Sequence, residues 1–160
     1  MKKFKKLISI FISIMVFFST TACTSPKPEK ESYKEQNVTD KYIVQNGQTD
    51  YVIVVPENTP STIKEAASEL IYFFKEATNI TLEQCTDNGL AYAEENKYIS
   101  LGYTKILSQA GISASTKELT AEGFKIETKG NSIFVVGGDN FGTLWGVYEL
   151  LTEWFDYDYF

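Results

Sequence analysis

The sequence predicts an α/β (α+β) fold: a mixed β-sheet of four to six strands with two main helices packed mainly on one face. Three observations lead to this prediction. Residues 51–55 are a continuous run rich in β-branched side chains, as expected of a strand covered on both faces. Residues 60–77 and 141–155 carry apolar side chains at helical spacing. Two alternating segments that flank Gly130-Asn131 predict a β-hairpin.

The first 22 residues predict a secretory signal peptide. Four lysines precede an apolar run from Leu7 to Phe18, and small residues follow up to Ala22, which is the order typical of such signals. The apolar run is short for a membrane span, which needs about 20 residues. Residues 20–23, Thr-Thr-Ala-Cys, resemble the lipobox of bacterial lipoproteins. This resemblance implies cleavage before Cys23 and lipidation of that cysteine; an ordinary cleaved signal with a spare thiol is the alternative.

Lipidation of Cys23 would anchor the protein to the extracytoplasmic face of the bacterial cell membrane, because each buried CH₂ of the lipid contributes about 0.8 kcal/mol. Residues 23–40 are rich in Pro, Lys, Glu and Ser and hold almost no apolar side chains. We therefore expect them to form a disordered tether. The folded domain is expected over residues 41–160, cut before a further domain, because the chain stops on aromatic residues without a helix-ending signal.

The charge and the residue types exclude several classes of function. The formal net charge is −6, and removal of residues 1–22 leaves 11 basic and 21 acidic residues, a net charge of −10. This balance argues against a nucleic-acid partner, because phosphate binding requires clustered Lys and Arg. The chain has no histidine, which removes histidine-based acid–base catalysis and the commonest metal ligand. We expect no cofactor and no metal.

The predicted strands are apolar or alternating runs bounded by turn residues. Pro56 ends the first long one, and a helix connects it to the next, which predicts a right-handed βαβ unit. The last two strands form the hairpin. The strands are expected at residues 42–44, 51–55, 80–85, 97–102, 123–128 and 132–136.

The first main helix is expected to begin at Pro60 with Thr59 as its cap. Thr62 and Glu65 match a capping box and would give a slightly later start. A short helix is also expected at residues 104–110. The buried stripe of the main helix is expected to comprise Ile63, Ala66, Ala67, Leu70, Phe74 and Ala77.

The last helix follows two glycines, with Asp139 or Asn140 as its cap. The glycine-rich sequence at residues 137–142 invites a phosphate-loop interpretation, but it lacks the Gly-Lys-Ser/Thr ending of such loops. We favour a tight turn that requires positive φ. The apolar stripe is expected to comprise Phe141, Leu144, Trp145, Tyr148, Leu151 and Phe155.

Four features resemble, in their order, the N-terminal accessory domain of bacterial α-glucuronidases and the related second domain of β-N-acetylhexosaminidases. They are the helix at 66–74, the strand at 98–102, the hairpin that starts at 122–124, and the glycines that lead into residues 142–151. The last segment, Gly-Thr-Leu-Trp-Gly-Val-Tyr-Glu-Leu-Leu, is the most specific. The resemblance implies an accessory domain that precedes a (β/α)₈ barrel carrying the catalytic carboxylates. Because that barrel is absent, no catalytic position maps onto this chain.

Carboxylates near the glycine turn are the only candidates for glycosidase chemistry, which needs two carboxyl groups. The candidates are Asp139, Glu149, Glu153, Asp156 and Asp158. Asp139 is interpreted as a helix cap, and Glu149 and Glu153 as part of a solvated helix surface. We assign no catalytic residue.

The aromatic cluster at the end of the chain is a candidate contact surface for a glycan or for the missing catalytic domain. It comprises Trp154, Phe155, Tyr157, Tyr159 and Phe160. The sequence therefore predicts a non-catalytic accessory domain of a membrane-anchored, cell-surface glycoside hydrolase, with carbohydrate as a further candidate partner. The alternative is a standalone surface lipoprotein that acts as a glycan- or protein-binding module.

Overall fold

The computed structural model of the protein describes residues 42–155. The predicted signal peptide, the lipidation site Cys23 and the predicted tether therefore lie outside the described residues. The same holds for Asp156, Tyr157, Asp158, Tyr159 and Phe160.

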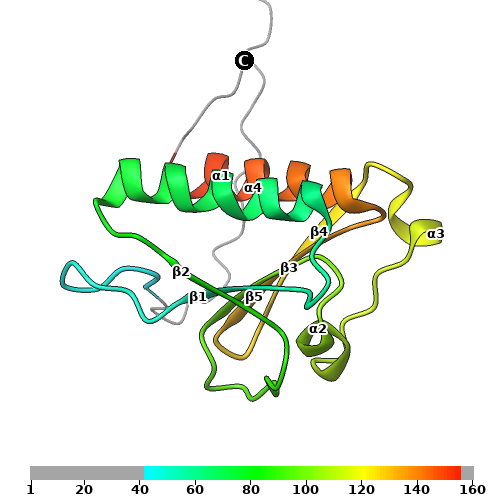
Figure 1. Cartoon of the computed structure of the whole chain (residues 1–160), viewed down its shortest axis with the longest axis horizontal. Coiled ribbons are helices and arrows are strands. Elements are labelled where there is room, and N and C mark those ends of the chain that lie inside the picture. The colour runs from blue at the N-terminus through cyan, green and yellow to red at the C-terminus, as the bar shows by residue number, and fades with distance from the viewer. Residues whose placement is uncertain (1–41, 156–160) are drawn as a thin grey trace, which may run out of the picture. The chain divides into compact units, whose positions relative to one another are not determined.

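In the described part, five strands form one sheet in the order β2-β1-β3-β5-β4 (Figure 1). The strands β2, β1, β3 and β5 are parallel to one another, and β4 is antiparallel to β5. The predicted mixed sheet is confirmed. The strands are β1 (Val52–Val55), β2 (Glu83–Thr86), β3 (Tyr98–Leu101), β4 (Phe124–Lys129) and β5 (Ser132–Gly137).

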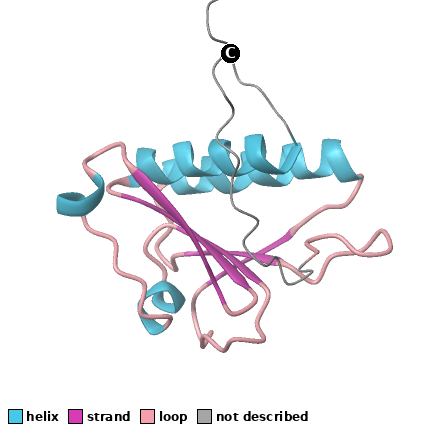
Figure 2. Ribbon diagram, turned by 180° about the vertical axis from the view of Figure 1, so that it is seen from behind, coloured by secondary structure: helices cyan, strands magenta, loops and turns pink. Residues whose placement is uncertain are grey.

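Two long helices cover one face of this sheet, as predicted. α1 (Ser61–Thr78) and α4 (Asn140–Phe155) lie side by side and run in the same direction (Figures 1 and 2). The short helix α2 (Lys105–Gln109) lies on the opposite side of the sheet (Figure 1). A further short helix, α3 (Thr116–Leu119), lies between the short helix predicted at residues 104–110 and the strand predicted at 123–128.

Both faces of the sheet bury apolar side chains. Ile53 and Val55 of β1 belong to the core under α1 and α4. Val54, between them, belongs to a second core with Phe134 of β5 and Ile106 of α2. Adjacent residues of a strand point to opposite faces, so the unbroken β-branched run of β1 fills both cores at once.

The first long helix, α1, begins later than predicted, and its last turn is more exposed than predicted. Pro60 is the cap position rather than the first helical residue, and no side chain caps the helix. The hydroxyl of Thr59 instead donates a hydrogen bond to the carbonyl of Pro56. Thr62 lies inside the helix, so the capping-box start is also wrong. Five of the six predicted stripe residues are buried; Ala77, in the last turn, is exposed.

Residues 42–44 do not form the predicted strand. Gln45 and Gln48 form an isolated antiparallel bridge around the predicted turn at Asn46-Gly47, whose φ angles are 54° and 73°. Ile43 and Val44 pack against the core under the two long helices instead of pairing with a strand. Their apolar character therefore serves side-chain packing rather than sheet formation.

The hairpin is confirmed. Strands β4 and β5 pair in register from Phe124–Gly137 to Lys129–Ser132. Gly130 in the connecting turn has a φ of 56°, a left-handed conformation that glycine adopts without steric cost.

Candidate functional site

Two of the predicted contact residues, Trp154 and Phe155, lie at the end of α4 and pack against other residues of the same domain. Trp154 and Phe155 are half-buried, and their ring centroids lie 6.3 Å and 5.8 Å from that of Phe74 in α1. They line a shallow cavity of about 370 Å³ together with residues 42–44 and Thr78. These rings join the last turns of the two long helices, and their predicted contact with a glycan or another domain stays a prediction.

Two other aromatic side chains of α4 are exposed. Phe141 is 55% exposed and Trp145 is 44% exposed, although the sequence predicted both as core. Tyr148 is half-buried, and its ring centroid lies 5.8 Å from that of Trp145. Glu65 and Glu69 of α1 act electrostatically on Tyr148. We call these five residues, Phe141, Trp145, Tyr148, Glu65 and Glu69, the outer helical surface.

Burial is the largest cause of a raised pKa for the Tyr148 phenol, and the negative charges of Glu69 and Glu65 raise that pKa further. Burial disfavours the phenolate because it is poorly solvated, and nearby carboxylates repel it. The outer helical surface is therefore apolar with an acidic edge.

Two glycines lie on the face of α4 that contacts the sheet, which is why the predicted stripe was wrong at two positions. Gly142 and Gly146 are buried. A Cβ atom at Gly146 would lie 2.7 Å from Cγ1 of Val135, and one at Gly142 would lie 2.4 Å from the carbonyl oxygen of Gly123. At these two positions the helix thus lies too close to its neighbours for any larger side chain. Its bulky rings Phe141 and Trp145 consequently turn outward.

The glycine-rich junction is a packing site. Gly137, Gly138 and Gly142 do not have positive φ angles, so the predicted turn with positive φ is wrong. A Cβ atom at Gly138 would lie 1.6 Å from the carbonyl oxygen of Thr120. The segment before β4 therefore passes directly over these glycines. Close backbone approach, rather than dihedral freedom, requires them.

The helix start at this junction is already occupied by the protein's own groups. The carboxylate of Asp139 accepts a hydrogen bond of 2.8 Å from the N–H of Gly142, which confirms it as the cap. The hydroxyl of Thr143 accepts one of 2.9 Å from the N–H of Gly137. A phosphate would meet the Asp139 carboxylate here, so the geometry argues against an anion site.

The carboxyl ends of the parallel strands, where α/β proteins commonly bind ligands, are also filled. The order β2-β1-β3 places the topological switch between β1 and β3. Asp87, only 2% exposed, lies there. Its carboxylate accepts hydrogen bonds from the N–H of Glu57 at 2.9 Å and of Lys105 at 2.7 Å. Asp87 lies just after the strand that the sequence predicted at residues 80–85, and no local pattern indicated this role.

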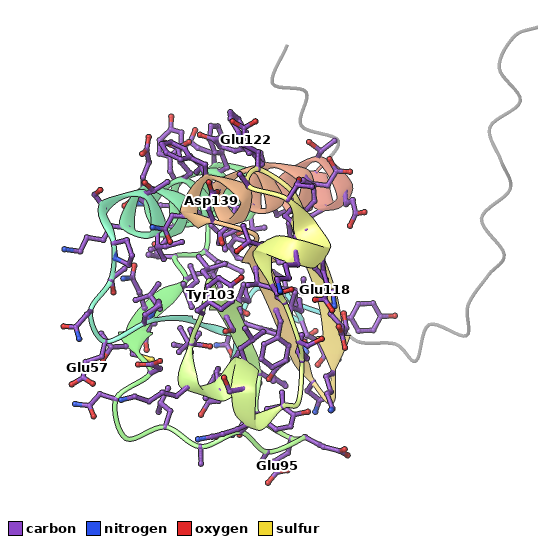
Figure 3. All side chains as sticks on the ribbon, turned by 90° about the vertical axis from the view of Figure 1, so that its right-hand side faces the viewer. Glu57, Glu95, Tyr103, Glu118, Glu122 and Asp139 are labelled. Atoms are coloured by element: carbon purple, nitrogen blue, oxygen red, sulfur yellow. The ribbon has the colours of Figure 1, made fainter. Side chains whose placement is uncertain are left out.

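The acidic residues labelled in Figure 3 do not gather at one place. Asp139 and Glu118 flank Tyr103, whereas Glu57 and Glu95 lie away from them. Burial first, and then the charges of Asp139 and Glu118, raise the pKa of Tyr103.

Within residues 42–155, no group of three or more acidic or thiol side chains could hold a metal ion. No helix within that range has the length and apolarity required to cross a bilayer.

Two solved structures show a distant likeness to the chain. One is a GH138 enzyme targeting pectin rhamnogalacturonan II, with a TM-score of 0.43 and 22% identity; the match covers 65% of this chain and 10% of that enzyme. The other is a GH115 4-O-methyl-α-glucuronidase with specificity for decorated arabinogalactans, with a TM-score of 0.47 and 17% identity; the match covers 67% of this chain and 15% of that enzyme. The chain thus spans a small part of either enzyme. A search of the curated proteins found no match.

The family comparison covers the whole sheet, all of α1 and most of α4. Residues 34–150 match the family described as "Glycosyl hydrolase family 67 N-terminus". This range includes most of the segment at residues 142–151 that carried the resemblance in the sequence. Because the match takes in most of the chain, the protein belongs to the family of glycosyl hydrolase family 67 N-terminal domains.

Proposed function

We propose that this chain is the non-catalytic accessory domain of a membrane-anchored, cell-surface glycoside hydrolase. The family match over residues 34–150 carries the proposal, because the family is described as the N-terminal part of a glycosyl hydrolase. The catalytic carboxylates would then lie in a domain that follows this one.

The positions of the described carboxylates support a non-catalytic role. Asp139 is engaged as the cap of α4. Glu149 and Glu153 are exposed on that helix. Glycoside hydrolysis requires one carboxyl group whose raised pKa keeps it protonated beside a second, ionised one. An exposed helix surface does not supply such a pair of environments.

The test of this role has two parts. The reading frame after the Phe160 codon is expected to continue for several hundred codons. The chain after its predicted signal, residues 23–160 with Cys23→Ser, is expected to leave aryl glycosides uncleaved, whereas the complete product of the frame cleaves one of them. Turnover by residues 23–160 that disappears in the Glu149→Gln or Glu153→Gln variant would overturn the non-catalytic assignment.

The anchoring rests on Cys23 and the preceding apolar run. A Cys23→Ser variant is expected to move from the membrane fraction to the medium, since it lacks the acceptor for the lipid. A Cys85→Ser variant is the matched control, because Cys85 is half-buried within the folded domain, and it should remain with the membrane. Equal membrane association of the Cys23→Ser protein would contradict lipid anchoring.

The exposed rings of Phe141 and Trp145 also favour a second candidate function, a standalone lipoprotein that binds a glycan or a protein. A stop codon directly after Phe160 would support this candidate. Affinity electrophoresis of residues 23–160 in gels containing soluble polysaccharides would then detect glycan binding as retarded migration, and the Trp145→Ala variant should migrate freely.

A further inference from the structure

A polar groove lies between the start of α1 and the edge strand β2. Its volume is about 620 Å³, which is within the range of small-molecule sites. β2 is the outermost strand on this side of the sheet. We call this feature the strand-edge groove, and its polar lining comprises Glu57, Asn58, Thr59, Lys64, Gln84 and Thr86.

Polar residues of β2 form one side of the groove. Gln84 pairs in register with Ile53, and Thr86 pairs with Val55; both partners belong to the core under α1 and α4. Side chains in register on neighbouring strands lie on the same face of a sheet. Gln84 and Thr86 therefore continue the core face, yet both are exposed. The sheet thus extends past the cover of the long helices and presents an amide and a hydroxyl there.

Four of the lining side chains are available to a ligand. Within residues 42–155, no hydrogen bond or ion pair engages the side chains of Asn58, Lys64, Gln84 or Thr86. Lys64 lies in the first turn of α1, on the side of the groove opposite β2. The groove therefore offers two amides, one hydroxyl and one ammonium group.

The loop between these two sides is held in place by its own hydrogen bonds. The hydroxyl of Thr59 donates to the carbonyl of Pro56. The N–H of Glu57 donates to the Asp87 carboxylate at 2.9 Å, and the N–H of Asp87 donates to the carbonyl of Val55 at 2.9 Å. Because the backbone is fixed before any ligand arrives, binding costs little conformational entropy.

The chemistry of the lining selects among ligands. Glu57 is the one carboxylate among the described lining residues, and it already pairs with Lys105 at 3.0 Å, so a metal ion has too few ligands. That carboxylate also disfavours a phosphate. A nucleobase needs a stacking ring, which the described lining lacks. Amides and hydroxyls both donate and accept, as sugar hydroxyls do.

We propose that the strand-edge groove is a saccharide subsite that holds one or two sugar residues of a glycan by their hydroxyl groups. This inference rests on the proposed function for its ligand class, because the accessory domain of a glycoside hydrolase works beside a polysaccharide. The ammonium group of Lys64 forms a charge-assisted hydrogen bond with a sugar carboxylate. A uronate therefore binds more tightly than the corresponding neutral sugar.

NMR titration of residues 23–160 carrying Cys23→Ser tests the subsite. The probes are xylose, glucose, galactose, glucuronate and galacturonate, each raised to tens of millimolar. The side-chain amide signals of Asn58 and Gln84 are expected to shift saturably, and the uronates should saturate them at concentrations at least about threefold lower. The amide of Gln109, which accepts a hydrogen bond from the N–H of Tyr92, is the internal control and should stay in place.

Substitutions locate the site. Gln84→Ala and Thr86→Val should each weaken sugar binding at least about fivefold, with the backbone signals of the core unchanged because both side chains are exposed. Glu83→Gln is the matched control on the same strand, where the adjacent side chain points to the other face, and it should leave binding of the neutral sugars unchanged. Lys64→Gln should remove the preference for uronates and retain the binding of neutral sugars.

The outcomes separate the proposals. Amide signals of Asn58 and Gln84 that shift with none of the five sugars overturn the subsite, and the proposed function stands if the reading frame continues. Binding in the groove by a chain whose frame stops after Phe160 supports the subsite and overturns the accessory assignment. Binding that survives Gln84→Ala and disappears in Trp145→Ala would place the sugar on α4 and overturn the inference.

Discussion

The buried carboxylate of Asp87 accepts a hydrogen bond of 2.7 Å from the backbone N–H of Lys105, the first residue of α2. Its other oxygen accepts one from the N–H of Glu57, after β1. The side chains of Lys105 and Glu57 also form an exposed ion pair of 3.0 Å. One side chain therefore joins the ends of three neighbouring strands.

An Asp87→Asn variant is expected to unfold at lower urea concentration, with a loss of stability of about 2–3 kcal/mol. The amide cannot accept at both positions, so one buried N–H would face an NH₂ group. Asp50→Asn is the matched control, because Asp50 pairs with Lys97 at the surface, where water screens the ion pair and its loss should change the stability little. Equal midpoints for the two variants would show that the Asp87 bridge contributes little.

A Gly142→Ala variant is expected to lose about 2 kcal/mol or more, in spite of the better helix propensity of alanine. The new Cβ would lie 2.4 Å from the Gly123 carbonyl oxygen, which belongs to the backbone and cannot rotate away. Thermal unfolding followed by circular dichroism measures the effect. The exposed Glu149→Ala substitution on the same helix should change the stability by less than about 0.5 kcal/mol.

Val147→Ala and Phe141→Ala together test which face of α4 is buried. Val147 is fully buried, so loss of two methyl groups should cost about 2 kcal/mol including the cavity. Phe141 is 55% exposed, and its truncation in residues 23–160 should cost less than about 1 kcal/mol. The opposite order in urea unfolding would support the face that the sequence predicted.

The raised pKa of Tyr148 predicts a dependence of stability on alkaline pH. Burial, and then the charges of Glu69 and Glu65, keep its phenol protonated to a higher pH in the folded state than in the unfolded state. The unfolded phenol titrates near pH ~10. The contribution of Tyr148 to stability is therefore complete below that pH and is lost as the pH rises through the raised folded pKa.

Tyrosine-selective ¹³C NMR would follow this titration, with Tyr148 assigned by a Tyr148→Phe variant. Glu69→Gln should move the Tyr148 titration to lower pH by removing one negative charge. Glu83→Gln, on the edge strand β2, should leave it unchanged. A Tyr148 titration that is unchanged in the Glu69→Gln variant would mean that the charge of Glu69 does not contribute to the raised pKa.

Local sequence patterns determined a large part of this fold. The run at residues 51–55 predicted a strand that is buried on both faces, and Gly130 predicted the hairpin turn. The pattern in the first long helix predicted five of its buried residues, and one of the two predicted cap residues, Asp139, caps α4. Each of these features depends on neighbours within a few positions, which the sequence displays directly.

Tertiary structure alone decided which side of α4 faces the sheet and where Asp87 acts. The apolar pattern ranks side chains by hydrophobicity, but the space between α4 and the sheet admits only glycine at positions 142 and 146, so Phe141 and Trp145 face outward. The partners of Asp87 lie 30 and 18 residues away along the chain. No local pattern encodes such distances, because only the pairing of the strands brings these backbone groups together.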